Sequence, residues 1–432
     1  MIRRVFASIA VDSGALRESP AFRRLFIGQL ISLVGRQITT VAVPFQIFLL
    51  THSPLAVGAA GVVQAAPLVA ASLGAGALTD HFDRRRILLV TQLGLAGCSA
   101  LLALGALWGR PPLAGIYLVV AAAAGIGAVD APARSAIVPN VVRPERLPGA
   151  LSLNFAMFST SVVAGPALGG LVIARTGLPL AYTIDVATFG AALYAVFRLS
   201  AQRPHGEQHE PPVQAIKRGL DYARTQPVIL GGFAMDLCAM VFGMPRALFP
   251  VLATSTFHVG AQGLGFMYAA IGAGSAAGAL STGWMRHTVR LGRVIVVAIA
   301  VWGAAIIAFG FVTQFWIALA LLVVAGAADS LSAVSRSTIM QTLVPDALRG
   351  RLSALYFMVV AGGPYVGDLE SGGVASAFTV QVSIVSGGVM CLLGLAAAAL
   401  LVPSVWRHRQ PQRGVPESLV MEPPTVVGGV VE

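Results

Sequence analysis

Charged residues are scarce in this 432-residue sequence: Asp, Glu, Lys and Arg make up 11% of it, whereas hydrophobic residues make up 56%. Soluble globular domains carry about 25% charged residues, so this composition excludes a water-soluble globule. A helix that crosses a bilayer needs about 20 apolar residues. We therefore expect a polytopic membrane protein with room for about a dozen spans.

Residues that build metal, redox or nucleotide sites are also scarce. The three cysteines, Cys98, Cys238 and Cys391, lie far apart in apolar stretches, which predicts neither a disulfide framework nor a zinc site. The sequence contains no GxxxxGK[ST] loop for ATP. We therefore expect no metal, no cofactor and no enzymatic activity. The first 20 residues contain Asp12 and Glu18 and no long apolar core, so no removable signal peptide is predicted.

Apolar runs separated by charges and by Pro or Gly turns indicate twelve spans. The predicted ranges are 25–50, 54–79, 86–108, 112–138, 148–174, 178–200, 227–254, 261–284, 292–312, 315–342, 347–375 and 378–402. These runs are about twice the length of a barrel strand and show no polar alternation, so an all-α fold is expected. The predicted domains are a segment 1–24, a six-helix bundle 25–200, a linker 201–226, a second six-helix bundle 227–402 and a tail 403–432.

The 29 Lys and Arg residues are unevenly distributed on this map. With the N-terminus placed inside, 23 of them fall in inside segments or at the inside ends of spans, 2 in outside loops and 4 in the interior of spans. Because Lys and Arg collect in cytoplasmic loops, both termini and the linker are predicted to be cytoplasmic. The same rule accounts for the net charge of +11 without a nucleic acid partner. We expect a multi-pass protein of the bacterial cytoplasmic membrane.

The chain repeats itself at a shift of 202 residues. Arg134, Ser135 and Ile137 then meet Arg336, Ser337 and Ile339, and Gly165 and Gly170 meet Gly367 and Gly372. A parallel repeat of two six-helix halves is the architecture of major facilitator transporters, which carry the substrate between the halves.

Two motifs resemble signatures of the major facilitator superfamily. The segment GAGALTDHFDRRR resembles its loop signature after the second span, although Asp83 replaces a customary glycine. The segment GPALGG resembles the antiporter motif of the exporters, with Ser161 in place of its first glycine. The resemblance implies gating roles for these residues: Gly76, Asp80, Arg84, Arg85, Gly165, Pro166, Gly169 and Gly170.

Longer stretches narrow the resemblance within the superfamily. They are PAFRRLFIGQLIS, VAVPFQIFLLTHSPLAVG, QGLGFMYAAIGAGSAAGALSTG and SLSAVSRSTIMQTLVPDALRGRLSAL, and together they resemble the enterobactin exporter branch. This branch includes siderophore exporters and drug efflux pumps, so the resemblance implies export and leaves the substrate open. The fourth span lacks the mid-span arginine that many drug/proton antiporters use for coupling.

Ten charged residues fall in the interior of the predicted spans, away from their inside ends. They are Arg36, Asp130, Arg134, Asp185, Asp236, Arg246, Asp329, Arg336, Asp368 and Glu370. A charge at the bilayer centre costs about 2.5–3.5 kcal/mol on insertion scales unless it meets water or a partner. Roles in substrate binding or proton coupling are predicted for Arg36, Asp130, Asp236, Arg246 and Asp329. No His lies in a span, so a proton relay would use carboxylates.

Pairing within this set is predicted from spacing. Arg36 lies near the midplane of the first span, and the 202-residue shift places it at Cys238, two residues from Asp236. Arg36 and Asp236 are therefore expected to form a pair, either a switchable or substrate-binding pair or a permanent structural one. Asp130 and Arg134 are four residues apart, which favours an intrahelical pair.

The other charged residues are interpreted one by one. Asp329 and Arg336 are seven residues apart, so direct contact is not expected, and a role across the interface between the halves stays open. Arg246 follows Pro245, and a proline can bend a helix near a binding site. The remaining acids, Asp185, Asp368 and Glu370, are placed near the outer ends of their spans, where snorkelling is the usual explanation.

These observations predict a monomeric secondary exporter of a small organic molecule, a siderophore or a drug-like amphiphile. Alternating access would move the substrate and proton antiport would drive it. The partners are the substrate, the proton and the lipid bilayer. The alternatives are a lipid or lysophospholipid flippase, an importer, and a non-transporting receptor or scaffold with a transporter fold.

Overall fold

A computed structural model describes residues 14–202 and 212–408. These residues form helices and no strands, which confirms the expected all-α membrane fold. The predicted N-terminal segment, linker and tail lie partly outside the described ranges. Ten described helices are long and apolar enough to cross a membrane.

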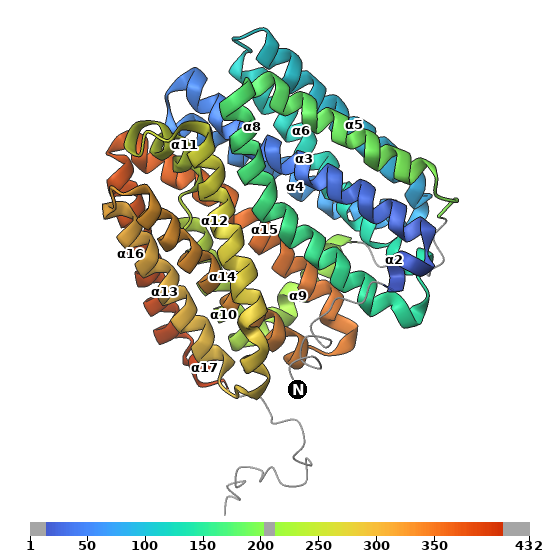
Figure 1. Cartoon of the computed structure of the whole chain (residues 1–432). Coiled ribbons are helices and arrows are strands. Elements are labelled where there is room, and N and C mark those ends of the chain that lie inside the picture. Colours follow the sequence, from blue (N-terminus) through green and yellow to red (C-terminus); the bar gives the residue numbers. More distant parts are fainter. Residues whose placement is uncertain (1–13, 203–211, 409–432) are drawn as a thin grey trace, which may run out of the picture.

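The first half runs from α2 to α8 (Figure 1). Its helices are α2 (Gly14–Glu18), α3 (Pro20–Thr51), α4 (Pro54–His81), α5 (Arg84–Leu107), α6 (Leu113–Ser135), α7 (Val138–Val141), a 3-10 turn η1 (Pro144–Arg146) and α8 (Leu147–Phe197). The 51-residue α8 contains both the fifth and the sixth predicted spans. Its two arms meet at Gly177, whose φ of 82° is accessible to glycine at little cost.

The second half follows the helix α9 (Pro212–Thr225). Its elements are α10 (Pro227–Phe242), η2 (Arg246–Leu248), α11 (Phe249–Val251), a π-helix η3 (Leu252–Thr256), α12 (Gly260–Leu280), η4 (Ser281–His287), α13 (Leu291–Phe311), α14 (Phe315–Leu343), α15 (Asp346–Ala377), α16 (Val380–Leu401) and α17 (Pro403–Arg407). Figure 1 shows the two halves side by side, with α9 between them. The helix α9 packs on α15 and also touches α4 and α10.

Local sequence explains where several helices begin. Ser19 and Ser53 cap α3 and α4, and each precedes a proline in the first turn. Thr379 caps α16 by accepting a hydrogen bond from the backbone N–H of Val382 at 3.1 Å. Asp83, which replaces the glycine of the loop signature, caps α5 by accepting from the backbone N–H of Arg85 at 2.9 Å.

The predicted bend near Pro245 is a break in the seventh span. The helix α10 ends at Phe242, and the chain resumes as the short turn η2 at Arg246. Trp302 of α13 occupies the break, where its indole N–H donates to the carbonyl of Gly243 at 2.9 Å. The break leaves Arg246 on a short turn instead of a continuous helix.

The two ends of the bundle differ in how the halves meet. We call the end that carries Arg84–Arg86 and α9 the basic end, and the opposite end the far end. At the far end, a Cβ added to Gly170 of α8 would lie 2.5 Å from the carbonyl oxygen of Ala261 of α12. A Cβ on Gly58 of α4 would lie 2.1 Å from that of Asp368 of α15. Near the basic end of α4, a Cβ on Gly76 would meet nothing within 4 Å.

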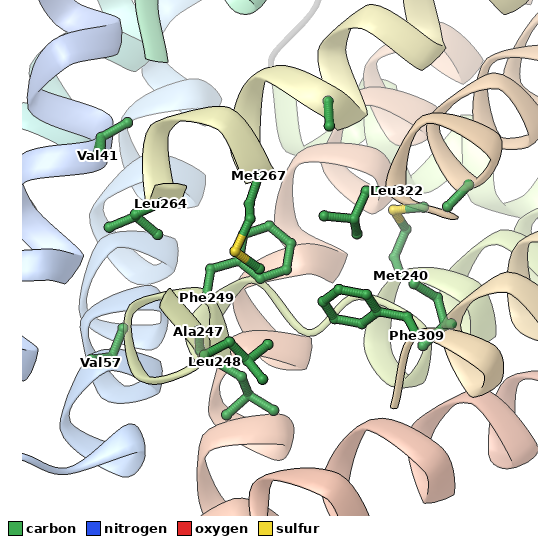
Figure 2. Close-up of a cluster of buried hydrophobic side chains, with 14 of the residues drawn as sticks. Val41, Val57, Met240, Ala247, Leu248, Phe249, Leu264, Met267, Phe309 and Leu322 are labelled. Atoms are coloured by element: carbon green, nitrogen blue, oxygen red, sulfur yellow. The ribbon is translucent and has the colours of Figure 1, made fainter. Parts of the chain in front are cut away.

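An apolar cluster joins the halves toward the far end. Val41 and Val57 come from the first half, and Ala247 and Leu264 come from the second (Figure 2). The halves are therefore packed together at the far end, whereas the space beside Gly76 near the basic end is open.

Candidate functional site

A cavity of about 1230 Å³ lies mainly among the helices of the first half and is bounded on one side by the second half. Its walls come from α3, α4, α5, α6 and the second arm of α8, together with η2, α12 and α15. It extends from Val57, in the far-end cluster, to Asp80 and Ser135 at the basic end. The lining is mainly apolar with a few charged groups, which is typical of small-molecule sites. The cavity volume exceeds the usual range for such sites, about 300–1,000 Å³.

The first charged group in the wall is Arg36 of α3. Its side chain is 36% exposed, and its guanidinium lies 4.0 Å from the carboxylate of Asp130. Asp130 is fully buried and accepts hydrogen bonds from Thr91 at 2.9 Å and Gln92 at 3.0 Å. It also pairs directly with Arg134, which confirms the predicted intrahelical pair. Because Asp130 has these closer partners, Arg36 remains available to the cavity.

The predicted pair of Arg36 and Asp236 is wrong. Asp236 of α10 pairs with Arg336 of α14 at 2.6 Å, and both side chains are buried within the second half. Arg336 also donates to Ser332 at 2.7 Å. This pairing is decided by which face of α10 packs against α14. The 202-residue shift between the two halves does not specify that face.

Three of the five residues assigned to substrate or proton coupling do not line the cavity. They are Asp130, Asp236 and Asp329. The spacing of Asp329 and Arg336 predicted no direct contact, and no ion pair links them in the described part of the chain. The charge of Arg336 still acts on Asp329 from a distance.

The second charged group in the wall is the pair of Arg246 and Asp368. Arg246 of η2 lies 3.2 Å from Asp368 of α15, and both line the cavity beside Tyr268 and Tyr365. Arg246 was predicted as a site residue, whereas Asp368 was expected to snorkel, and that expectation is wrong.

The third charged group is Asp185 on the second arm of α8. It is 1% exposed and accepts hydrogen bonds from the hydroxyl groups of Thr39 at 2.6 Å and Ser99 at 2.7 Å. All three residues line the cavity. The expected snorkelling of Asp185 is therefore also wrong.

The sequence contains a signal that places both Asp185 and Asp368 deep in the membrane instead of at the ends of their spans. Asp185 lies eight residues after the turn at Gly177. At a rise of about 1.5 Å per residue this is a depth of about 12 Å, close to the middle of a hydrocarbon core about 30 Å thick. Asp368 lies a similar distance from the end of α15 at Ala377.

The loop signature ties together three helix ends at the basic end. Arg84 donates to the carbonyl of Ala136 after α6 at 3.0 Å, and Arg85 donates to that of Phe197 at the end of α8 at 2.8 Å. Cations at helix C-termini are favoured by the helix dipole. Asp83 also accepts from the backbone N–H of Gln202 at 2.9 Å. These contacts hold the basic end of the first half together, and the gating roles of this segment stay predictions.

The glycine motif in α8 packs closely on two helices. A Cβ on Gly165 would lie 2.4 Å from Cβ of Gln37, and one on Gly169 would lie 2.9 Å from Cα of Ile38, both on α3. Gly170 and the carbonyl of Pro166 instead face α12 of the other half. The motif therefore packs α8 closely within its own half and across the interface.

Comparison with known proteins agrees with this architecture. The model of the family described as transmembrane secretion effector matches residues 14–429. The enterobactin exporter EntS of Citrobacter koseri is 30% identical over 400 residues, which cover 92% of this chain and 95% of the relative. The enterobactin exporter EntS of Escherichia coli O1:K1 is 29% identical over 398 residues, with 91% and 95% coverage.

Solved structures share the fold at low sequence identity. A bacterial homologue of the lysosomal transporter Spinster, in an inward-facing and unoccupied conformation, has a TM-score of 0.72 at 14% identity and covers 90% of this chain and 98% of its own. A single-substitution mutant of the nucleoside transporter NupG has a TM-score of 0.71 at 14% identity, with 89% and 98% coverage. The chain belongs to the transmembrane secretion effector family of the major facilitator superfamily, and it is a membrane transporter, not an enzyme.

Proposed function

We propose that this transporter exports a small organic molecule from the cytoplasm by alternating access, in exchange for entering protons. The cavity, which lies mainly in the first half and borders the second, is the observation that carries this proposal. It borders both bundles, which pack closely at the far end, and it reaches the basic end at Asp80 and Ser135. Rocking of the bundles around such a site exposes it to each side of the membrane in turn.

The proposed substrate is a siderophore or a drug-like amphiphile. Two relatives that are similar over more than nine-tenths of this chain are named as enterobactin exporters. The cavity is large, and its apolar walls carry Arg36, Asp185, Arg246 and Asp368. Apolar walls would hold the body of an amphiphile, and the charged groups would orient its polar groups.

The proposed direction rests on the charge distribution. Inside segments and the inside ends of spans contain 23 of the 29 Lys and Arg residues in the predicted topology, so the basic end is assigned to the cytoplasm. The cavity reaches that end at Asp80 and Ser135. In this orientation the conformation described here would load substrate from the cytoplasm.

Everted membrane vesicles test this proposal with enterobactin as the probe. Export becomes uptake into the vesicle lumen, which we expect when the lumen is acidic. The uptake should stop when a protonophore collapses the gradient and should not respond to sodium.

Two variants sharpen the vesicle assay. Arg36→Gln removes one of the cations from the cavity wall and should reduce uptake, whereas Arg110→Gln removes an exposed arginine from an outside loop and should not. Enterobactin movement in the opposite direction under the same gradient would refute export. Equal transport with and without the gradient would refute proton antiport.

A further inference from the structure

The cavity reaches a helix that lies away from the second half. Four of the lining residues, Leu95, Cys98, Ser99 and Leu102, belong to α5. The helix α5 packs on α6 and α8 of its own half, and Figure 1 shows it on the side of the first half that faces away from the second. The cavity therefore continues into the interior of the first half. We call this part, which is bounded by α5 and by Phe189 of α8, the recess.

Small residues on α6 open the way into the recess. The α6 side chains that line the cavity include Ala123, Ala124 and Ala128, and α6 touches α3 at only a few positions. A Cβ added to Gly127 of α6 would lie 3.3 Å from Nη2 of Arg36, which belongs to α3. The guanidinium of Arg36 therefore lies between α3 and α6, at the mouth of the recess.

One face of α5 forms the back wall of the recess. Its residues Leu95, Cys98, Ser99 and Leu102 are three or four positions apart, so they lie on the same side of the helix. All four are buried from the outer surface of the protein. At about 1.5 Å per residue this face is about 10 Å long, which is sufficient for an aromatic ring with its substituents.

The strong polar groups of the recess are bonded to one another. The hydroxyl groups of Ser99 and Thr39 donate to the carboxylate of Asp185 at 2.7 and 2.6 Å, and Asp185 is 1% exposed. The thiol of Cys98 is only a weak donor. A charged or strongly polar occupant would lose its hydrogen bonds to water without replacing them, so the recess favours an apolar occupant.

We propose that the recess is a second binding subsite, which takes an uncharged aromatic arm of the exported molecule. Phe189 supplies a ring for stacked or edge-to-face contact with that arm. The polar groups of the same molecule stay at the mouth, beside Arg36. The inference rests on the proposed export of an amphiphile and makes the recess the part of the site that selects for an aromatic arm.

Cys98 allows a direct chemical test of the recess. It lines the cavity, whereas Cys238 and Cys391 do not. In the full chain with Cys238→Ala and Cys391→Ala, a maleimide that enters the recess adds to Cys98: a bond forms from sulfur to one ring carbon, and the thiol proton moves to the other. The rates with N-ethylmaleimide and N-phenylmaleimide are measured by mass spectrometry. The phenyl-to-ethyl rate ratio should exceed that of a control thiol about tenfold or more, because the phenyl group binds in the recess before the reaction.

The control thiol is Leu104→Cys in a protein without the three native cysteines. Leu104 is exposed on the outer side of the same helix and does not line the cavity, so it corrects for the preference of the phenyl reagent for detergent. Equal rate ratios at the two positions would overturn the aromatic subsite. A Cys98 thiol that reacts only after unfolding would show that the recess is closed to solutes and would also overturn it.

Enterobactin, whose arms end in aromatic rings, connects the recess to transport. At saturating concentration it should slow the labelling of Cys98 about tenfold or more and leave that of Leu104→Cys unchanged. Proteoliposomes with the phenyl adduct at Cys98 should lose most of their gradient-driven enterobactin transport, whereas the adduct of Leu104→Cys should retain it. Labelling that enterobactin does not slow, or full transport by the Cys98 adduct, would overturn the recess as a substrate subsite. An unlabelled protein without enterobactin transport would instead overturn the proposed function.

Discussion

Replacing Gly170 with alanine should shift the transporter away from the conformation that is packed at the far end. The added Cβ would lie 2.5 Å from the carbonyl oxygen of Ala261 and 2.9 Å from Cα of Gly265, both on α12 of the other half. These are backbone atoms, so no flexible side chain can move aside. Overpacking of this kind costs about 1–3 kcal/mol. The cost applies only while α8 and α12 are in contact, so it acts on the conformational equilibrium.

A cost of about 2 kcal/mol changes the ratio of two conformations about 30-fold. Distances between spin labels at Arg110 and Gln314, which are exposed on far-end loops of the two halves, can measure this ratio. The labels require a background without the three native cysteines. We expect the distance distribution of Gly170→Ala to shift toward longer values. Substrate exchange should slow, because the conformation that loads from the basic end becomes rarer.

Gly190→Ala is the matched control, because it lies on the same helix and its Cβ would meet nothing within 4 Å. Alanine is about 1 kcal/mol more favourable than glycine within a helix, so this variant should be as stable as the parent or more so, with unchanged distances. An unchanged distribution for a folded Gly170→Ala variant would refute the assignment of the far-end contact as the one that opens.

Three further predictions concern the loop signature, the second half and the topology. Asp80→Asn should lower the turnover rate more than substrate affinity, since its signature position implies a conformational role, and loss of binding with normal turnover would contradict this. Asp236→Asn should lower the free energy of unfolding by about 3–5 kcal/mol, because it leaves Arg336 buried without its counter-charge. Thermal unfolding in detergent measures this loss. The double variant Asp236→Leu with Arg336→Met should recover most of it. Reporter fusions within 201–226 should report a cytoplasmic location, and an external one would refute the predicted orientation.

The spans and their breaks follow from the sequence alone. Each apolar run must satisfy its own backbone hydrogen bonds in lipid, so its length and composition suffice to predict a helix. Pro245 predicts a bend before Arg246, because a proline removes a backbone donor, and the structure has a break there. The pair of Asp130 and Arg134 is predictable for a similar reason, since a spacing of four residues places both side chains on one face of one helix.

Only the tertiary structure shows which charged residues on different helices meet. The spanning helices are apolar on all sides, so their sequences do not specify which face packs on which neighbour. The sequence therefore places Arg36 and Asp236 at similar depths, whereas the rotation of α10 directs Asp236 to Arg336. The same limit explains Asp185: its depth can be counted from Gly177, but its contacts with Thr39 and Ser99 arise only where three helices pack together.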